Sequence, residues 1–103
     1  MKHAIILAHP SVDSFTYRMA QAYEEAIIAK GDSAVSRDLY RISFNPCLSE
    51  NEIPWATHFE VHADVAEERG LLSDVSVFAF FYPLWLNSPP AILKGYMERV
   101  FGM

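Results

Sequence analysis

The chain has 103 residues, of which 51% are hydrophobic and 14% aromatic, and this composition predicts one small folded domain over residues 1–103. Thirteen acidic residues against eight basic ones give a net charge of −5. Surfaces that bind nucleic acid or anionic membranes carry clustered positive charge, so this balance argues against both kinds of partner. It is compatible with one bound phosphate, because backbone amides at a helix N-terminus hold phosphate without lysine or arginine.

The N-terminal sequence and the cysteine content indicate a cytoplasmic protein. Cys47 is the single cysteine, so no disulfide can form within the chain and nothing points to an oxidising compartment. The apolar run near the N-terminus is broken by His9 and Pro10. It is therefore shorter than the apolar region of a signal peptide, and far shorter than a membrane span.

The first part of the chain predicts a strand, a helix and a second strand. Residues 4–8 form a continuous apolar run, typical of a strand that is buried on both faces. A helix is predicted over residues 14–30, with either Asp13 or Ser14 as its N-cap, and residues 33–39 form a weaker strand. The apolar stripe of this helix comprises Phe15, Met19, Ala22, Tyr23, Ala26 and Ile27.

The middle of the chain is irregular. Residues 40–61 show no clean period and are predicted to form a loop with one short turn, followed by a short acidic helix over residues 63–72. We expect the Glu67–Glu68 pair of this helix to face solvent. His58 and His62 have the spacing of zinc ligands on a helix, and Glu60 and Asp64 are acidic neighbours. Because the segment is irregular and no further ligand is evident, we expect a solvated surface and no metal.

The last part of the chain carries the strongest strand pattern. Residues 75–81 are apolar and aromatic, and a turn region over residues 82–88 follows them. Pro89 and Pro90 fit the first positions of a helix that extends to about residue 101, with Ser88 as its cap, because a missing N–H costs nothing there.

The order of these elements predicts an α/β fold with a parallel sheet and helices on both faces. Right-handed crossovers leave two arrangements of the strands, 1-2-3 and 2-1-3. The first strand is the more uniformly apolar, which favours the order 2-1-3 with strand one in the centre. A crevice then opens between the C-terminal ends of strands one and three, and ligands bind at such switch points.

Two loops would meet in this crevice. The loop over residues 9–16 is rich in hydroxyl groups and enters a helix directly, which makes it a candidate phosphate cradle. The loop over residues 82–88 is aromatic and constrained by proline, which suits a flat ring system. Neither loop carries a GxGxxG or Walker A motif.

At these loops the sequence resembles the flavodoxin-like NAD(P)H:quinone oxidoreductase family, also called DT-diaphorase-like. The matching motifs are Ala8-His9-Pro10, Asp13-Ser14-Phe15-Thr16, Asp38-Leu39-Tyr40, Phe44-Asn45-Pro46, Tyr82-Pro83-Leu84-Trp85, Pro90-Ala91-Ile92-Leu93-Lys94-Gly95 and Glu98-Arg99-Val100-Phe101. They span nearly the whole chain, and the last two are the most specific. The resemblance implies a flavodoxin-like three-layer fold.

The resemblance also implies a flavin, either FAD or FMN. The phosphate-bearing arm would lie along His9, Ser14, Phe15 and Thr16, and the isoalloxazine ring along Pro83, Leu84, Trp85, Leu86 and Asn87. Phe15 would contribute its backbone N–H while its side chain packs in the core. Family members form homodimers and transfer a hydride from NAD(P)H to the flavin and then to a quinone-like acceptor.

The chain departs from the family pattern in its length. Family members continue with a second half that carries the tyrosine and histidine beside the flavin, so we expect this chain to be a truncated N-terminal part. We assign no catalytic side chain and expect strand 75–81 to be an open apolar edge. Two alternatives are a catalytically inactive flavin-binding or dimerisation module and a flavodoxin-type electron carrier.

Overall fold

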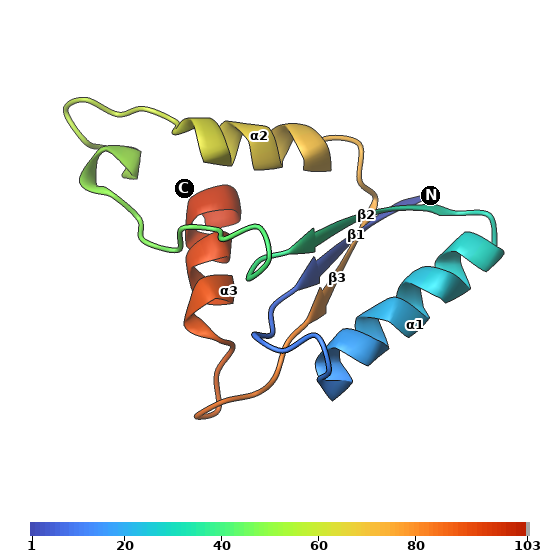
Figure 1. Cartoon of the computed structure of the whole chain (residues 1–103). Coiled ribbons are helices and arrows are strands. Elements are labelled where there is room, and N and C mark those ends of the chain that lie inside the picture. Colours follow the sequence, from blue (N-terminus) through green and yellow to red (C-terminus); the bar gives the residue numbers. More distant parts are fainter. Residues whose placement is uncertain (103) are drawn as a thin grey trace.

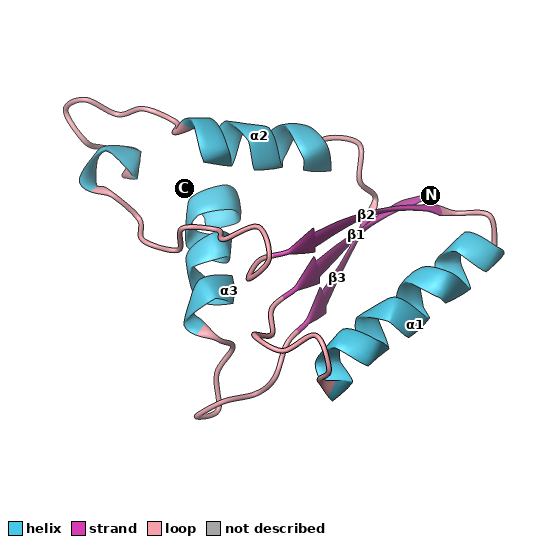
Figure 2. Cartoon of the chain, viewed as in Figure 1, coloured by secondary structure: helices cyan, strands magenta, loops and turns pink. Residues whose placement is uncertain are grey.

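The computed structural model describes residues 1–102 and contains a three-stranded parallel sheet with helices on both faces (Figures 1 and 2). In chain order the elements are β1 (Lys2–Leu7), α1 (Phe15–Ala29), β2 (Ser33–Asp38), the 3₁₀ turn η1 (Glu50–Glu52), α2 (Ala63–Leu72), β3 (Val77–Phe81), α3 (Ala91–Tyr96) and the π-helical turn η2 (Met97–Gly102). None of the helices within residues 1–102 has the length and apolar character needed to cross a membrane.

The strand order is β2-β1-β3, which confirms the predicted arrangement with the first strand in the centre. β1 begins at Lys2, two residues before the predicted strand, because Lys2 already pairs with Ser33 of β2. β3 begins at Val77, later than predicted, because the Val75 N–H turns back to the Leu72 carbonyl at 3.2 Å. The pattern of apolar residues does not show which backbone groups pair, so the predicted starts of both strands were wrong by two residues.

β1 supplies the core on both faces of the sheet. Ala4 and Ile6 are fully buried on the face covered by α2 and α3, whereas Ile5 and Leu7 are buried against α1 (Figure 1). Because successive side chains of a strand point to opposite faces, only a continuously apolar strand can fill both layers. The uniform composition of β1 is therefore the reason that it occupies the centre.

Helix α1 meets the sheet through only part of the predicted stripe: Ile27 and Tyr23 contact the core, whereas Ala22 and Ala26 are exposed. Ser14 is its N-cap and accepts the Tyr17 N–H at 3.1 Å, which decides between the two candidate caps. Ala20 and Ile27 are buried, but Phe15 and Met19 are exposed. Apolar residues occur on more than one side of this helix, so the sequence period alone left the rotation of the helix open, and its docking against β1 determined it.

Glu68 of α2 is buried, contrary to the expectation of a solvated Glu67–Glu68 pair; Glu67 alone is exposed. The Glu68 carboxylate accepts hydrogen bonds from the Arg37 guanidinium of β2 at 2.7 Å and from the Tyr96 hydroxyl of α3 at 2.8 Å. Burial, together with the neighbouring Glu68, raises the pKa of the Tyr96 phenol far above its ordinary value. Glu68 therefore ties α2 to β2 and α3.

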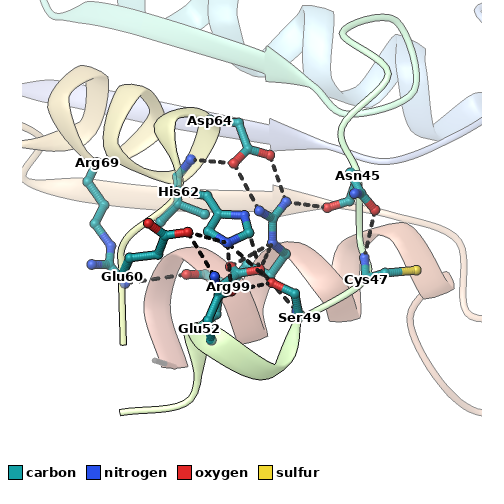
Figure 3. Close-up of polar contacts among 11 residues, drawn as sticks. Asn45, Cys47, Ser49, Glu52, Glu60, His62, Asp64, Arg69 and Arg99 are labelled. Carbon is teal, nitrogen blue, oxygen red and sulfur yellow. Dashed lines mark hydrogen bonds and ion pairs between the residues drawn. The ribbon is translucent and has the colours of Figure 1, made fainter. Parts of the chain in front are cut away.

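A second ion pair network, centred on the buried Arg99, holds the irregular middle segment (Figure 3). Arg99 of η2 is 2% exposed and donates to Glu52 at 2.9 Å, to Asp64 at 2.7 Å and to the Asn45 carbonyl at 2.6 Å. We call these four residues the Arg99 cluster. One guanidinium thus joins the loop after β2, η1 and the start of α2, because its planar fork offers several donors at fixed angles.

The carboxylates of the Arg99 cluster titrate below their ordinary range. The Arg99 guanidinium lowers the pKa of Asp64 from its ordinary value of 3.8. Burial alone would raise the pKa of Glu52, but hydrogen bonds from the Ser49 backbone N–H and from Arg99 outweigh burial and hold that pKa below 4.5. Both carboxylates are therefore ionised in the folded chain at neutral pH.

Helix α3 starts later than the sequence indicated. Pro90 is its N-cap, so Pro89 and Pro90 do not occupy the first helical positions and Ser88 is not the cap. Ser88 instead closes the preceding turn by exchanging two backbone hydrogen bonds with Trp85. Further along, Gly95 packs directly on the backbone of Pro46, and a Cβ at Gly95 would collide with the Pro46 carbonyl oxygen.

β3 lies at the edge of the sheet, as predicted, and its outer part is apolar. Phe78 and Phe80 are partly exposed, and both make edge contacts with Phe101, with ring centroids 5.4 and 6.2 Å apart. An exposed apolar edge strand offers unpaired backbone groups to other chains and is an aggregation hazard.

The close approach of α3 to the loop after β2 predicts opposite effects at two glycines. Gly95→Ala should lower the free energy of unfolding by about 2–3 kcal/mol, because the Pro46 backbone cannot yield to a methyl group. The matched control is Gly70→Ala in α2, where no atom lies within 4 Å of the added Cβ; it should raise stability by about 0.5–1 kcal/mol. Urea unfolding measures both, and equal effects would contradict the packing.

The Arg99 cluster predicts loss of stability in acid. Since the folded pKa values of Asp64 and Glu52 lie below 3.8 and 4.5, their contribution is complete above these values and is lost as the pH falls through the folded pKa. Asp64→Asn should cost about 0.5–1 kcal/mol at pH 7, because the Asp64 side chain is half-exposed and solvent screens its ion pair, and it should flatten the acid dependence. Glu60→Gln, at an exposed neighbouring carboxylate, serves as the control. Parallel pH profiles of Asp64→Asn and the unchanged chain in urea unfolding would refute the assignment.

Candidate functional site

The bend after β1 and the bend after β3 lie side by side at one end of the sheet (Figure 1). The Ala8 N–H donates to the Phe81 carbonyl at 3.0 Å, which keeps the two strands paired up to the bends. The rings of His9 and Trp85 then meet edge to face, with centroids 5.7 Å apart. The convergence predicted from the strand order is confirmed, and we define residues 9–16 and 82–88 as the candidate site.

The first bend ends in the N-terminus of α1, where backbone donors are free. Ser14 caps the helix by accepting the Tyr17 N–H, but the amides of Phe15 and Thr16 have no acceptor among residues 1–102. The partial positive charge of the helix start adds to these donors, so an anion is favoured here. The Phe15 side chain is 69% exposed, so the expected packing of this ring in the core was wrong, while its backbone N–H is available.

His9 adds a side-chain donor to the same bend. Its Nδ1 atom accepts the Ser11 backbone N–H at 2.9 Å. A neutral imidazole carries one proton, so this bond places the proton of the neutral ring on Nε2. His9 is thereby set to donate from Nε2.

Arg41 holds the first bend in place, a role that the sequence did not reveal. Its guanidinium donates to the carbonyl of Pro10 at 2.8 Å and also to the carbonyl of His9. It is anchored in turn by Asp38 at the end of β2, at 3.1 Å. The spacing between Arg41 and the bend is more than thirty residues, and no local pattern reports such a contact.

The second bend is a tight turn in an unfavourable backbone conformation. Trp85 and Ser88 exchange backbone hydrogen bonds of 3.0 and 2.9 Å around Leu86 and Asn87, whose φ angles are +50° and +60°. Asparagine tolerates positive φ, but a leucine there costs about 1–2 kcal/mol. The amides of Leu86 and Asn87 have no acceptor in the described part of the chain, so the strained turn presents two free donors.

Apolar surface surrounds this turn. The side chain of Leu86 is fully exposed, and those of Leu84 and Trp85 are exposed for more than two fifths of their area. Beside them lies a hollow of about 560 Å³. It is lined by Trp85, Leu86, Ser88, Pro89, Pro90, Ala91, Lys94 and Met97. The second bend therefore combines amide donors with uncovered apolar side chains.

These residues fit the two ends of a flavin. Free amides and an Nε2–H donor match the acceptor oxygens of a phosphate, and the donors of the strained turn match the heteroatoms of a ring that lies on apolar surface. The structure brings all nine predicted contact residues to the same end of the sheet: His9, Ser14, Phe15, Thr16, Pro83, Leu84, Trp85, Leu86 and Asn87.

The alternative zinc reading at His58 and His62 has no support in the geometry. No helix spans these two residues, because α2 begins after its N-cap His62. His62 bonds to the Asn51 side chain at 2.8 Å, and Asp64 belongs to the Arg99 cluster (Figure 3). Within residues 1–102, no three His, Cys, Asp or Glu side chains are grouped so that they could hold a metal ion.

Comparison with known proteins agrees with this geometry. A family model described as a flavodoxin-like fold matches residues 1–103. A Haemophilus influenzae protein named as an uncharacterized NAD(P)H oxidoreductase is 40% identical over 101 residues, which cover 97% of this chain and 50% of that protein. The rat NAD(P)H dehydrogenase [quinone] 1 is 36% identical over 115 residues, covering 93% of this chain and 41% of the rat protein.

A solved structure shows the same arrangement. The NAD(P)H:quinone oxidoreductase from Methanothermobacter marburgensis superimposes with a TM-score of 0.88 at 35% identity, over 99% of this chain and 55% of that one. The chain thus spans about half the length of the curated relatives it matches. With the whole of its sequence matched by the family model, the chain belongs to the flavodoxin-like fold family, alongside relatives named NAD(P)H oxidoreductase and NAD(P)H:quinone oxidoreductase.

Proposed function

We propose that the chain binds the flavin, FMN or FAD, of an NAD(P)H:quinone oxidoreductase between its two bends. The observation that carries the proposal is the juxtaposition of the His9 and Trp85 rings, 5.7 Å apart, at the C-terminal ends of β1 and β3. In open α/β sheets, ligands bind outside these ends at the point where the strand order reverses. The sheet order β2-β1-β3 places that point between the two bends.

The phosphate arm of the flavin would lie along the first bend. The free amides of Phe15 and Thr16 and the Nε2–H of His9 supply three donors, while the Thr16 and Ser14 hydroxyl groups lie beside them. Ser14 serves as helix cap at the same time, because its Oγ accepts from Tyr17 and its own hydroxyl proton is still available as a donor.

The isoalloxazine ring would lie on the second bend. Trp85 offers a flat exposed surface and Leu84 an apolar one. The amides of Leu86 and Asn87 have no acceptor within residues 1–102 and would donate to ring heteroatoms. Pro83 restricts the backbone that leads into the turn, so that these donors are oriented before the ligand arrives.

The bound flavin would supply the hydride chemistry, taking a hydride from NAD(P)H and passing two electrons to a quinone-like acceptor. The side chains of this chain hold and orient the cofactor and exclude water from one of its faces.

We propose further that the protein acts in the cytoplasm as a homodimer. Leu86 and Met97, which line the hollow, and Leu84 have exposed apolar side chains, and a second copy of the chain would cover them; light scattering tests this.

Trp85→Leu should weaken the affinity for FMN about tenfold, because an aromatic contact is worth about 0.5–1.5 kcal/mol beyond its buried area. Quenching of flavin fluorescence during titration of the chain measures this. Trp55→Leu is the matched control, since Trp55 is 81% exposed on the loop before α2, and that loop lies away from both bends (Figure 1). A chain that binds neither FMN nor FAD would refute the flavin site, as would equal effects of the two substitutions.

Leu86→Asn should stabilise the chain and leave its turn intact. Asparagine adopts positive φ with little strain, and the exposed leucine side chain has no packing to lose, so we expect a gain of about 1 kcal/mol in urea unfolding. Leu71→Asn is a control at a similarly apolar but helical position, and it should not stabilise. Unchanged or reduced stability of Leu86→Asn would show that the turn is unstrained.

A non-catalytic module is the second candidate, because the chain spans half of its relatives. Oxidation of NAD(P)H in the presence of a quinone separates the two readings. Turnover by this chain supports the oxidoreductase. Binding of FMN by this chain without any turnover supports the module.

A further inference from the structure

Arg41 and His9 lie on opposite sides of a single peptide unit. The Arg41 guanidinium donates to the Pro10 carbonyl at 2.8 Å, and the N–H of the same peptide, on Ser11, donates to His9 Nδ1 at 2.9 Å. The peptide is trans, because no cis peptide bond occurs within residues 1–102. In a planar trans peptide the C=O and N–H bonds point in opposite directions. The direction of the Ser11 N–H is therefore set by whatever holds the Pro10 carbonyl.

Arg41 is well placed to hold that carbonyl. A second guanidinium nitrogen donates to the His9 carbonyl, and the Nε atom donates to Asp38 at 3.1 Å. The planar guanidinium is thus held by three acceptors, two carbonyls of the bend and the Asp38 carboxylate. Because Asp38 ends β2, the guanidinium is anchored to the sheet and not only to the bend. A lysine could not reproduce this, because an ammonium lacks the rigid planar fork that reaches two carbonyls and a carboxylate together.

We propose that Arg41 is a positioning residue for the anion end of the candidate site, acting through the Pro10–Ser11 peptide on the tautomer of His9. The Ser11 N–H occupies Nδ1 and so keeps the neutral imidazole protonated at Nε2, the atom that would donate to a flavin phosphate. Arg41 also neutralises the negative ends of the two carbonyl dipoles in the bend. The inference rests on the proposed function for the identity of the anion, and on geometry alone for the tautomer.

Two substitutions separate the geometry of Arg41 from its charge. Arg41→Gln removes the charge and the fork, and Arg41→Lys keeps the charge but loses the fork. Lys30→Gln, at an exposed cation beyond the other end of α1, controls for the net charge. If charge alone mattered, Arg41→Lys would behave like the unchanged chain; the proposal expects it to resemble Arg41→Gln.

The first readout is the ¹⁵N chemical shift pair of the His9 side chain in the flavin-free chain, at a pH about two units above the ordinary histidine pKa of about 6.5. The unchanged chain and Lys30→Gln should show the Nε2–H form, and both Arg41 variants should show a mixture of tautomers. An Nε2–H form that persists in both Arg41 variants would overturn the proposal. This readout does not depend on any bound flavin.

The second readout compares FMN with riboflavin, which lacks the phosphate. Arg41→Gln should weaken FMN binding about tenfold, the scale of one oriented hydrogen bond to a charged group, and change riboflavin binding less than about twofold. Equal losses for both ligands would mean that Arg41 only supports the fold, and would overturn the proposal. If the unchanged chain binds neither ligand, the flavin function fails, while the tautomer measurement still decides the role of Arg41.

Discussion

The burial of β1 on both faces is the constraint on which the rest of the structure depends. A strand with Ala4 and Ile6 on one face and Ile5 and Leu7 on the other must have a layer on each side, so it takes the central position between β2 and β3. Its parallel pairing with β3 then brings two bends that are some seventy residues apart in the chain to the same end of the sheet. The candidate site is a consequence of this packing, because the anion-binding donors lie on the first bend and the apolar turn lies on the second.

The site is held in shape by interactions that come from outside it. Arg41 fixes the first bend from the end of β2, and the exchange of hydrogen bonds between Trp85 and Ser88 keeps the second bend in a conformation that leucine disfavours. Further away, hydrogen bonds of Arg99 and Glu68 attach the middle segment and α2 to the C-terminal elements α3 and η2. Residues of α3 and η2 line the apolar hollow beside Trp85. Donors held in this way need little rearrangement when a ligand arrives, which lowers the entropy lost on binding.

The sequence predictions were right where a feature depends on residues close together in the chain, and wrong where it depends on residues far apart. The strand order, the Ser14 cap among its two candidates and the loop over residues 40–61 depend on composition or on near neighbours, and the structure agrees with them. The expectations for Phe15, for Glu68 and for the start of α3 were wrong, because burial of a helix face and partners on other elements decided them. Glu68 shows the reason most clearly: a carboxylate that looks solvated in the sequence is buried when Arg37 and Tyr96 satisfy it.

The amino-acid sequence by itself determined the α/β class, the central place of β1 and the two segments that form the site, since these follow from apolar runs and turn residues that are local in the chain. Only the tertiary structure decided that Arg41 supports His9, that Leu86 lies in the left-handed region and that Arg99 joins three separate segments. Such contacts join residues more than thirty positions apart, or depend on the path of the backbone through a folded turn. No pattern of neighbouring residues encodes them, because their energy arises only after the sheet and helices have packed.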